Sequence, residues 1–259
     1  MRRRVGIGVA LAAVALLGAA LAHGEVRRAG NLQISFNGAI EPHSLPRERP
    51  VPVTLSVSGR IMTTDDSHPP PLRWLRLELN RAGRLSTTGL ATCRASSLQS
   101  TTSKAALARC QPALVGRGSF AAELDGGMTP IPTRGRILVF NAIAAGKPSL
   151  LLHLYGSTPI QSTYVLSLKI RHQAKGEFGT VLVTRLPNLA GGVGSITAID
   201  LEIGREYTYR GERRGYLSAS CAAPEGFNTA PFSLARGTFR FAGGTDLETS
   251  LTRDCRVRD

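Results

Sequence analysis

The sequence predicts a mainly β protein, an antiparallel β-sandwich of Greek-key or jelly-roll-like type with one short helix and two disulfides. Three observations predict it. Polar and apolar residues alternate over many short segments, which is the pattern of half-buried strands. Glycine (28) and proline (15) are spread along the 259 residues and supply frequent turns. Four cysteines fall into two local pairs. Many short strands with regular turns are typical of a sandwich or barrel.

The alternating segments define the expected strands. They are residues 31–36, 51–57, 75–79, 136–143, 149–155, 164–171, 180–186, 196–203, 215–220, 237–241 and 247–252. Gly243 and Gly244 separate the last two, which predicts a C-terminal hairpin because tight turns need positive φ angles. Two proline-rich stretches, 41–49 and 63–71, are expected loops because proline donates no hydrogen bond to a sheet.

The sequence also predicts one short helix, which ends at a cysteine, and two disulfides. Ser103 is the expected helix cap, residues 104–109 are good helix formers, and the helix is expected to end at Cys110. Four cysteines allow three pairings. The sequential pairing, Cys93–Cys110 and Cys221–Cys255, is expected because each pair lies in one compact segment. Neither pair has the spacing of a zinc or redox motif, so both are interpreted as structural disulfides of an oxidising compartment.

Residues 1–22 have the order of a secretory signal peptide. Three arginines follow Met1, residues 5–22 carry no charge, and Ala20-Leu21-Ala22 is a small-x-small cleavage site. The mature chain is therefore expected to begin at His23 and to be secreted. The alternative is a retained membrane anchor over residues 5–22, which is close to the ~20 residues needed to span a bilayer. Residues 23–259 are expected to form one extracytoplasmic β-sandwich domain; the alternative is a sub-boundary near Gly204 with a C-terminal segment 205–259.

The chain is basic, with 32 Lys+Arg against 18 Asp+Glu and a net charge of +14. Such a surplus attracts anionic partners, here a cell-wall polymer or a membrane surface. The arginines are dispersed and aromatics make up only 5%, so no nucleic acid is expected. A GC-rich genome, which favours Arg, Ala, Gly and Pro codons, explains the same composition.

One basic segment with aromatics is the candidate binding site. A hairpin carrying arginine and tyrosine can bind an anionic polymer or stack on sugar rings. Glu206 and Glu212 in the same segment favour the alternative, cross-strand ion pairs on a solvated hairpin. The candidate residues are Arg205, Tyr207, Tyr209, Arg210, Arg213 and Arg214.

No catalytic residue, metal site or cofactor is assigned. The chain has no Gly-x-Ser-x-Gly elbow, and His153 lies in an apolar strand that alternates it outward. Asp65, Asp66 and His68 are interpreted as a solvated loop, because calcium needs more oxygen ligands. Asp200 and Glu202 share one strand face, as an acid/base pair can, but the alternation marks that face as the outward polar one. Gly191 to Gly194 precedes a strand pattern and is interpreted as a turn rather than a phosphate-binding loop.

The chain contains the spaced motifs Ser218-x-x-Cys221-x-x-Pro224-x-Gly226-Phe227, Phe239-x-Phe241-x-Gly243-Gly244-Thr245 and Leu251-x-Arg253-x-Cys255, together with Cys93, Cys110, Val115-Gly116-x-Gly118 and Phe140-Asn141. These motifs resemble those of uncharacterised exported proteins of GC-rich actinobacteria. The resemblance covers most of the mature chain and implies a fold and a compartment but no activity.

The expected function is that of a secreted or cell-wall-associated, non-enzymatic protein with a binding or structural role. An exported hydrolase acting on a cell-wall polymer or an ester is the alternative, and a membrane-anchored extracellular domain is a third. Acidic or histidine side chains converging in a concave site would favour the hydrolase. A basic or aromatic sheet face would favour binding.

Overall fold

The computed structural model describes residues 25–127, 129–159 and 161–258. The expected signal peptide, the cleavage site before His23 and the alternative anchor over residues 5–22 lie outside the described residues. Within the described part of the chain, no helix has the length and apolarity that a membrane crossing requires.

The described residues form one large sheet and two small ones, so the mainly β prediction is confirmed. All pairs of strands are antiparallel except β18 and β3. Long connections place β6 between β12 and β17, and β13 between β5 and β8, as in Greek-key proteins. In spatial order the large sheet contains β1 (Glu25–Ala29), β2 (Leu32–Glu41), β5 (Thr54–Thr63), β13 (Gly194–Ile203), β8 (Leu114–Leu124), β9 (Ile131–Ala144), β10 (Lys147–Thr158), β11 (Ser162–His172), β12 (Phe178–Arg185), β6 (Leu72–Asn80), β17 (Thr229–Phe241), β18 (Asp246–Val257) and β3 (Ser44–Leu45).

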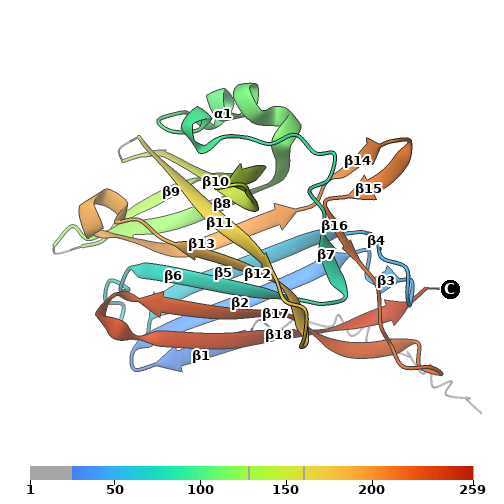
Figure 1. Ribbon diagram of the computed structural model, residues 1–259. Coiled ribbons are helices and arrows are strands. Elements are labelled where there is room, and N and C mark those ends of the chain that lie inside the picture. Colours follow the sequence, from blue (N-terminus) through green and yellow to red (C-terminus); the bar gives the residue numbers. More distant parts are fainter. Residues whose placement is uncertain (1–24, 128, 160, 259) are drawn as a thin grey trace, which may run out of the picture.

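The large sheet folds over so that its two ends meet. The N-terminal strand β1 contacts β18, near the opposite end of the strand order (Figure 1). Phe36 on β2 packs edge-on against Phe239 on β17, with ring centroids 6.1 Å apart. A Cβ atom at Gly38 would lie 3.0 Å from Leu251 on β18, so glycine permits the close approach of the two layers. The inward side chains of both layers form the apolar core, which consists of a main cluster and a smaller one of Leu32, Ile34, Leu72, Phe241 and Leu247.

A small sheet covers one end of the core. It contains β4 (Val51–Pro52), β16 (Leu217–Ala219) and β7 (Gly83–Leu85), and lies near β3 at the right of Figure 1. Leu217 is buried in the main core, and Val51 and Leu85 pack against it. The predicted Cys221–Cys255 disulfide is confirmed and ties the chain after β16 to β18, with Cα atoms 5.7 Å apart.

A helical segment covers the outer face of β9 and β10. It consists of η1 (Ala95–Ser97), α1 (Ser103–Cys110) and η2 (Gln111–Ala113), and lies above the sheet in Figure 1. Leu98 and Ala106 are fully buried against Phe140 and Leu151 of the sheet, which makes a second core outside the folded sheet. The predicted Cys93–Cys110 disulfide closes this segment. The helix cap is Thr102, not Ser103 as expected: its hydroxyl accepts from the Ala105 N–H at 3.2 Å.

The C-terminal hairpin is also confirmed. β17 and β18 pair antiparallel and are joined by η4 (Ala242–Gly244), in which Gly243 and Gly244 have φ angles of 82° and 85°. The stretch expected as a loop at 41–49 contains the two-residue strand β3, which pairs with β18. Strands from both sides of Gly204 share the large sheet, since β17 pairs with β6.

Candidate binding cavity

The space between the two layers of the large sheet contains a cavity of about 130 Å³. We call it the interior cavity. Most of the residues that line it are leucine, isoleucine or valine, among them Ile34, Val57, Leu77, Leu154, Leu168 and Ile199. They come from β2, β5, β6, β10, β11 and β13, so both layers contribute.

The local sequence explains why the space is not filled. Inward positions on β6, β10 and β11 repeat leucine at every second residue, for example at Leu150, Leu152 and Leu154. A closed sheet with more strands encloses a wider interior, and these leucine side chains leave part of it unfilled. The aromatic residues of the lining are Phe36, Tyr216 and Phe239. The cavity is therefore a consequence of a long sheet with a leucine interior.

Tyr216 is the tyrosine among the residues that line the interior cavity. Its side chain is fully buried, and its hydroxyl has no hydrogen-bond partner among the described residues. The backbone on either side is fixed, because the Tyr216 N–H donates to the Arg205 carbonyl at 2.7 Å and the Ser86 N–H donates to the Tyr216 carbonyl at 2.9 Å. Burial raises the pKa of Tyr216 above its ordinary value of 10, so the hydroxyl stays protonated near neutral pH.

A second, smaller space adjoins the interior cavity under the small sheet. It has a volume of about 50 Å³, and Leu85, Leu217 and Leu234 line both spaces. The apolar space thus continues towards the end of the fold that β4, β16 and β7 cover.

The six candidate residues of the basic segment lie on or next to a separate two-stranded hairpin, β14 (Glu206–Tyr209) and β15 (Glu212–Gly215). Two of them hold neighbouring segments. Arg205 donates to the carbonyls of Pro112 and Leu114 at 2.6 and 2.9 Å, where the helical segment ends. The Tyr207 hydroxyl donates to the Thr88 carbonyl at 2.8 Å.

The other candidates lie together on the hairpin. The guanidinium groups of Arg210 and Arg214 each lie 5.3 Å from the centre of the Tyr209 ring. Arg213 pairs with Glu206, and Arg214 pairs with Glu212 at 2.7 Å. The first is a cross-strand ion pair, as the alternative interpretation expects, whereas the second joins two residues of β15; both offset part of the positive charge. Polymer binding by this hairpin stays a prediction.

Asp200 and Glu202 line an open groove on the outer surface, so they face outward as the alternation predicts. Arg117 and Arg136 line the same groove. Asp200 forms an ion pair with Arg60 at 3.1 Å, which places a cation beside it. No histidine is among the described residues that line this groove.

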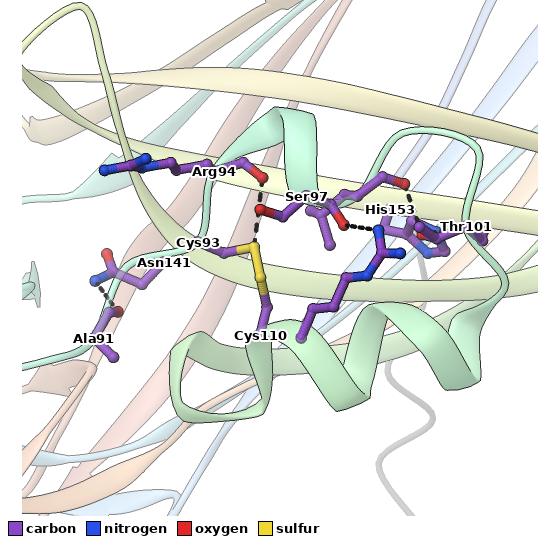
Figure 2. The surroundings of a disulfide bond; sticks show 10 residues. Ala91, Cys93, Arg94, Ser97, Thr101, Cys110, Asn141 and His153 are labelled. Atoms are coloured by element: carbon purple, nitrogen blue, oxygen red, sulfur yellow. Dashed lines mark hydrogen bonds between the residues drawn. A yellow bond between two sulfur atoms is a disulfide. The ribbon is translucent and has the colours of Figure 1, made fainter.

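His153 lies on the outer face of β10, but the helical segment covers it completely (Figure 2). Its Nε2 atom is 3.0 Å from the Thr101 carbonyl, which can only accept, so Nε2 carries the proton. Its Nδ1 atom is buried and has no partner in the described chain. Burial lowers the pKa of His153, against a smaller opposite effect of the Thr101 hydrogen bond, and favours the neutral ring.

The remaining candidate residues, around Asp65 and Gly191, lie in loops and turns. Asp65 accepts from Ser67 at 2.6 Å and from Asn31 at 2.9 Å, and these hydrogen bonds lower the pKa of Asp65 to about 2. His68 contacts the Glu123 carbonyl. Gly191 and Gly192 lie in the short turn η3 (Leu189–Gly192) and lead into strand β13. No group of three or more metal-ligating side chains occurs within residues 25–127, 129–159 and 161–258.

Sequence reasoning missed the interior cavity and Tyr216. The sequence did contain a hint of this lining, because Tyr216 directly precedes Leu217 in an expected strand and the other expected strands carry many inward leucines.

The two disulfides indicate that the chain folds in an oxidising, extracellular environment. No protein-family model matches the chain, and no curated protein or solved structure shows significant similarity to it.

Proposed function

We propose that this chain is an exported, non-enzymatic binding protein that holds a small apolar molecule in its interior cavity. The observation that carries the proposal is the space of about 130 Å³ walled by aliphatic side chains. Apolar cavities of ~150 Å³ stay dry and bind benzene-sized molecules. The ligand class is therefore one small ring or a short branched chain.

The size of the empty space supports a binding role. At ~24 cal/mol per Å³, an unfilled space of 130 Å³ lowers stability by about 3 kcal/mol. That is a large share of the ~5–15 kcal/mol by which native proteins are stable. A bound apolar molecule restores the missing contacts, so occupancy and stability are linked.

Export is the second part of the proposal. The arginine-led, uncharged segment at 1–22 and its Ala20-Leu21-Ala22 site support secretion. The two disulfides support the same compartment. The resemblance of the cysteine and glycine motifs to exported actinobacterial proteins is consistent with it. Sequencing the N-terminus of secreted protein tests this part: His23 is expected, and Met1 on membrane-bound protein would favour the anchor.

Toluene is the probe for the cavity. At ten times its Kd, a ligand that binds only the folded protein stabilises it by about 1.4 kcal/mol. For a chain of this size that raises the Tm by roughly 3–6 °C. Leu154→Trp places a larger side chain in the interior cavity and is expected to abolish the toluene-induced shift in Tm. If this variant does not fold, Val57→Phe fills the same cavity and is expected to have the same effect.

The matched control is Ile143→Trp, which introduces the same side chain at a residue that is 61% exposed. This control is expected to keep the full toluene-induced shift. An oxidised wild-type protein whose Tm does not respond to toluene, or an equal response in the Leu154→Trp variant, would remove the interior cavity as the binding site.

A further inference from the structure

We propose that the open groove lined by Asp200 and Glu202, here called the outer groove, binds an acidic glycan chain in which a uronic acid adjoins a neutral sugar. The outer groove lies on the solvent side of the sheet, opposite the interior cavity, so its ligand is additional to the one of the proposed function. The groove has a volume of about 1190 Å³ and is bordered by Leu107 and Gln111 of the helical segment. It is therefore large enough for several sugar units.

The register of neighbouring strands arranges the polar side chains of the outer groove in a row. From β2 through β5, β13 and β8 to β9, each residue directly opposite the next, the row consists of Asn37, Ser58, Asp200, Ser119 and Arg136. Neighbouring strands lie ~4.8 Å apart, so the row is about 19 Å long. The strand spacing is close to the length of one sugar ring, so an extended glycan that follows the row places about one unit over each strand.

Two arginines at one end of the outer groove are available to an anion. Arg117 and Arg136 are exposed, lie on the adjacent strands β8 and β9, and form no ion pair within the described part of the chain. Arg205 also lines the groove, but its guanidinium donates to the carbonyls of Pro112 and Leu114. A guanidinium group binds a carboxylate through two parallel hydrogen bonds. The carboxylate of a uronic acid therefore fits over β8 and β9.

The two carboxylates of the outer groove favour a glycan over a polyphosphate. Asp200 pairs with Arg60 at 3.1 Å, whereas Glu202 is exposed and forms no ion pair with another described residue. A polyphosphate or a nucleic acid carries a charge on every unit, so its chain would place anions against these carboxylates. The hydroxyl groups of a neutral sugar instead donate hydrogen bonds to them, and Ser56 and Ser58 lie beside them on β5. A chain whose acid groups are separated by neutral units therefore matches the groove.

The probe is a hyaluronan hexasaccharide, in which glucuronate alternates with N-acetylglucosamine. It is titrated into the oxidised protein in a calorimeter at physiological ionic strength, where long-range attraction between charges is screened. The neutral N-acetylglucosamine hexamer and a short polyphosphate are the comparison ligands. Wild type is expected to bind the hexasaccharide at least about tenfold more tightly than either of them.

Variants of the groove test which groups hold the chain. Arg117→Gln and Arg136→Gln are each expected to weaken hexasaccharide binding about tenfold. The matched control is Arg134→Gln, which removes the same charge from an exposed residue of β9 outside the groove lining, and its Kd is expected to stay within about twofold of wild type. Glu202→Ala removes an acceptor for sugar hydroxyls and is also expected to weaken binding about threefold, although the protein becomes more positive.

Several results would overturn the inference. No binding of the hexasaccharide to wild type is one, and tighter binding of the polyphosphate than of the hexasaccharide is another. Tighter hexasaccharide binding by Glu202→Ala, or an equal loss in Arg134→Gln and Arg136→Gln, would show that net charge alone attracts the chain. The toluene-induced rise in Tm is expected to be unchanged in all these variants, so the inference and the proposed function can fail separately.

Discussion

At the scale of single residues, Glu78 shows how a charge is held on a covered sheet face. It lies on the outer side of β6 with a side chain only 3% exposed. Arg76 and Arg236 donate to its two carboxylate oxygens at 2.8 and 2.6 Å, and the Arg236 guanidinium lies 4.7 Å from the centre of the Phe178 ring. Burial alone would raise the pKa of Glu78, but the hydrogen bonds from Arg236 and Arg76 outweigh it and lower the pKa.

Replacing Glu78 with glutamine is expected to destabilise the fold by about 1–3 kcal/mol at pH 7, because two charge-assisted hydrogen bonds are weakened. The pKa of Glu78 is lower in the folded protein than its ordinary value of 4.5, which applies to the unfolded chain. Its carboxylate therefore stabilises the fold fully at pH values above 4.5, and this contribution is lost as the pH falls through the folded-state pKa. The difference between wild type and Glu78→Gln in urea unfolding is therefore expected to shrink from pH 7 to pH 3. The control, Glu225→Gln at an exposed position between β16 and β17, is expected to lie within ~0.5 kcal/mol of wild type.

His153 is expected to make the fold acid-sensitive through burial. Its folded-state pKa is lowered from 6.5, so the unfolded chain binds a proton first as the pH falls. Folding stability is unaffected above about pH 6.5 and decreases as the pH falls from there towards the folded pKa. His153→Gln keeps an N–H for the Thr101 carbonyl but does not titrate. Its unfolding free energy should change less between pH 7 and pH 5 than that of wild type, whereas the exposed His172→Gln variant should follow wild type. Parallel pH profiles for wild type and His153→Gln would contradict a buried neutral ring.

At the scale of elements, each disulfide attaches a small element to the large sheet. Cys93–Cys110 closes the helical segment over β9 and β10, where Asn141 donates to the Ala91 carbonyl at 2.9 Å and fixes the chain before Cys93 (Figure 2). Cys221–Cys255 attaches the chain after β16 to β18, and the Cys221 N–H donates to the Pro46 carbonyl at 2.9 Å. Both disulfides attach elements that are too short to be stable alone.

Removing the Cys221–Cys255 disulfide tests how much it contributes to the stability of the fold. Replacing Cys221 and Cys255 together with serine is expected to lower stability by about 2–5 kcal/mol, because the 34-residue loop is no longer closed in the unfolded chain. Thermal unfolding of the oxidised proteins measures it. A double variant that melts within a degree of wild type would show that core packing holds the end of β18 without the disulfide.

The elements also show what local pattern can and cannot predict. Strands with strict alternation, such as those at 31–36 and 75–79, were predictable because the period alone identifies a half-buried strand. Strand β8 was not predicted, since Gly116 and Gly118 interrupt its apolar positions. Glycine is needed there because a Cβ at Gly118 would lie 2.0 Å from the Asp200 carbonyl oxygen on the neighbouring strand. That contact is made by residues far apart in the sequence and is invisible to a local pattern.

The candidate sites follow the same rule. The hairpin at 205–214 and the outward face of Asp200 and Glu202 were predictable, because both depend on neighbouring residues. The burial of His153 was not, because alternation places it outward and only the packing of the helical segment covers it. The pairing of Arg205 with the carbonyls at the end of the helical segment also depends on tertiary packing.

At the scale of the whole molecule, the interior cavity results from how the sheet closes. The sequence predicts a sandwich, and the structure forms its two layers from one large sheet whose ends, β1 and β18, come into contact. Which inward leucines face each other across the core depends on that closure, and so does the volume left between them. The amount of empty space cannot be derived from alternation, although the low aromatic content of 5% favours it.

The central claim is that a small apolar molecule occupies the interior of the fold. The most direct test is an NMR measurement of nuclear Overhauser effects between toluene and methyl-labelled, oxidised protein. Cross-peaks from the toluene ring protons to the methyl groups of Leu154, Leu168 and Ile199 are expected, since these line the interior cavity from three strands. Cross-peaks confined to exposed methyl groups such as those of Ile143 and Val26, or no cross-peaks at saturating toluene, would contradict it.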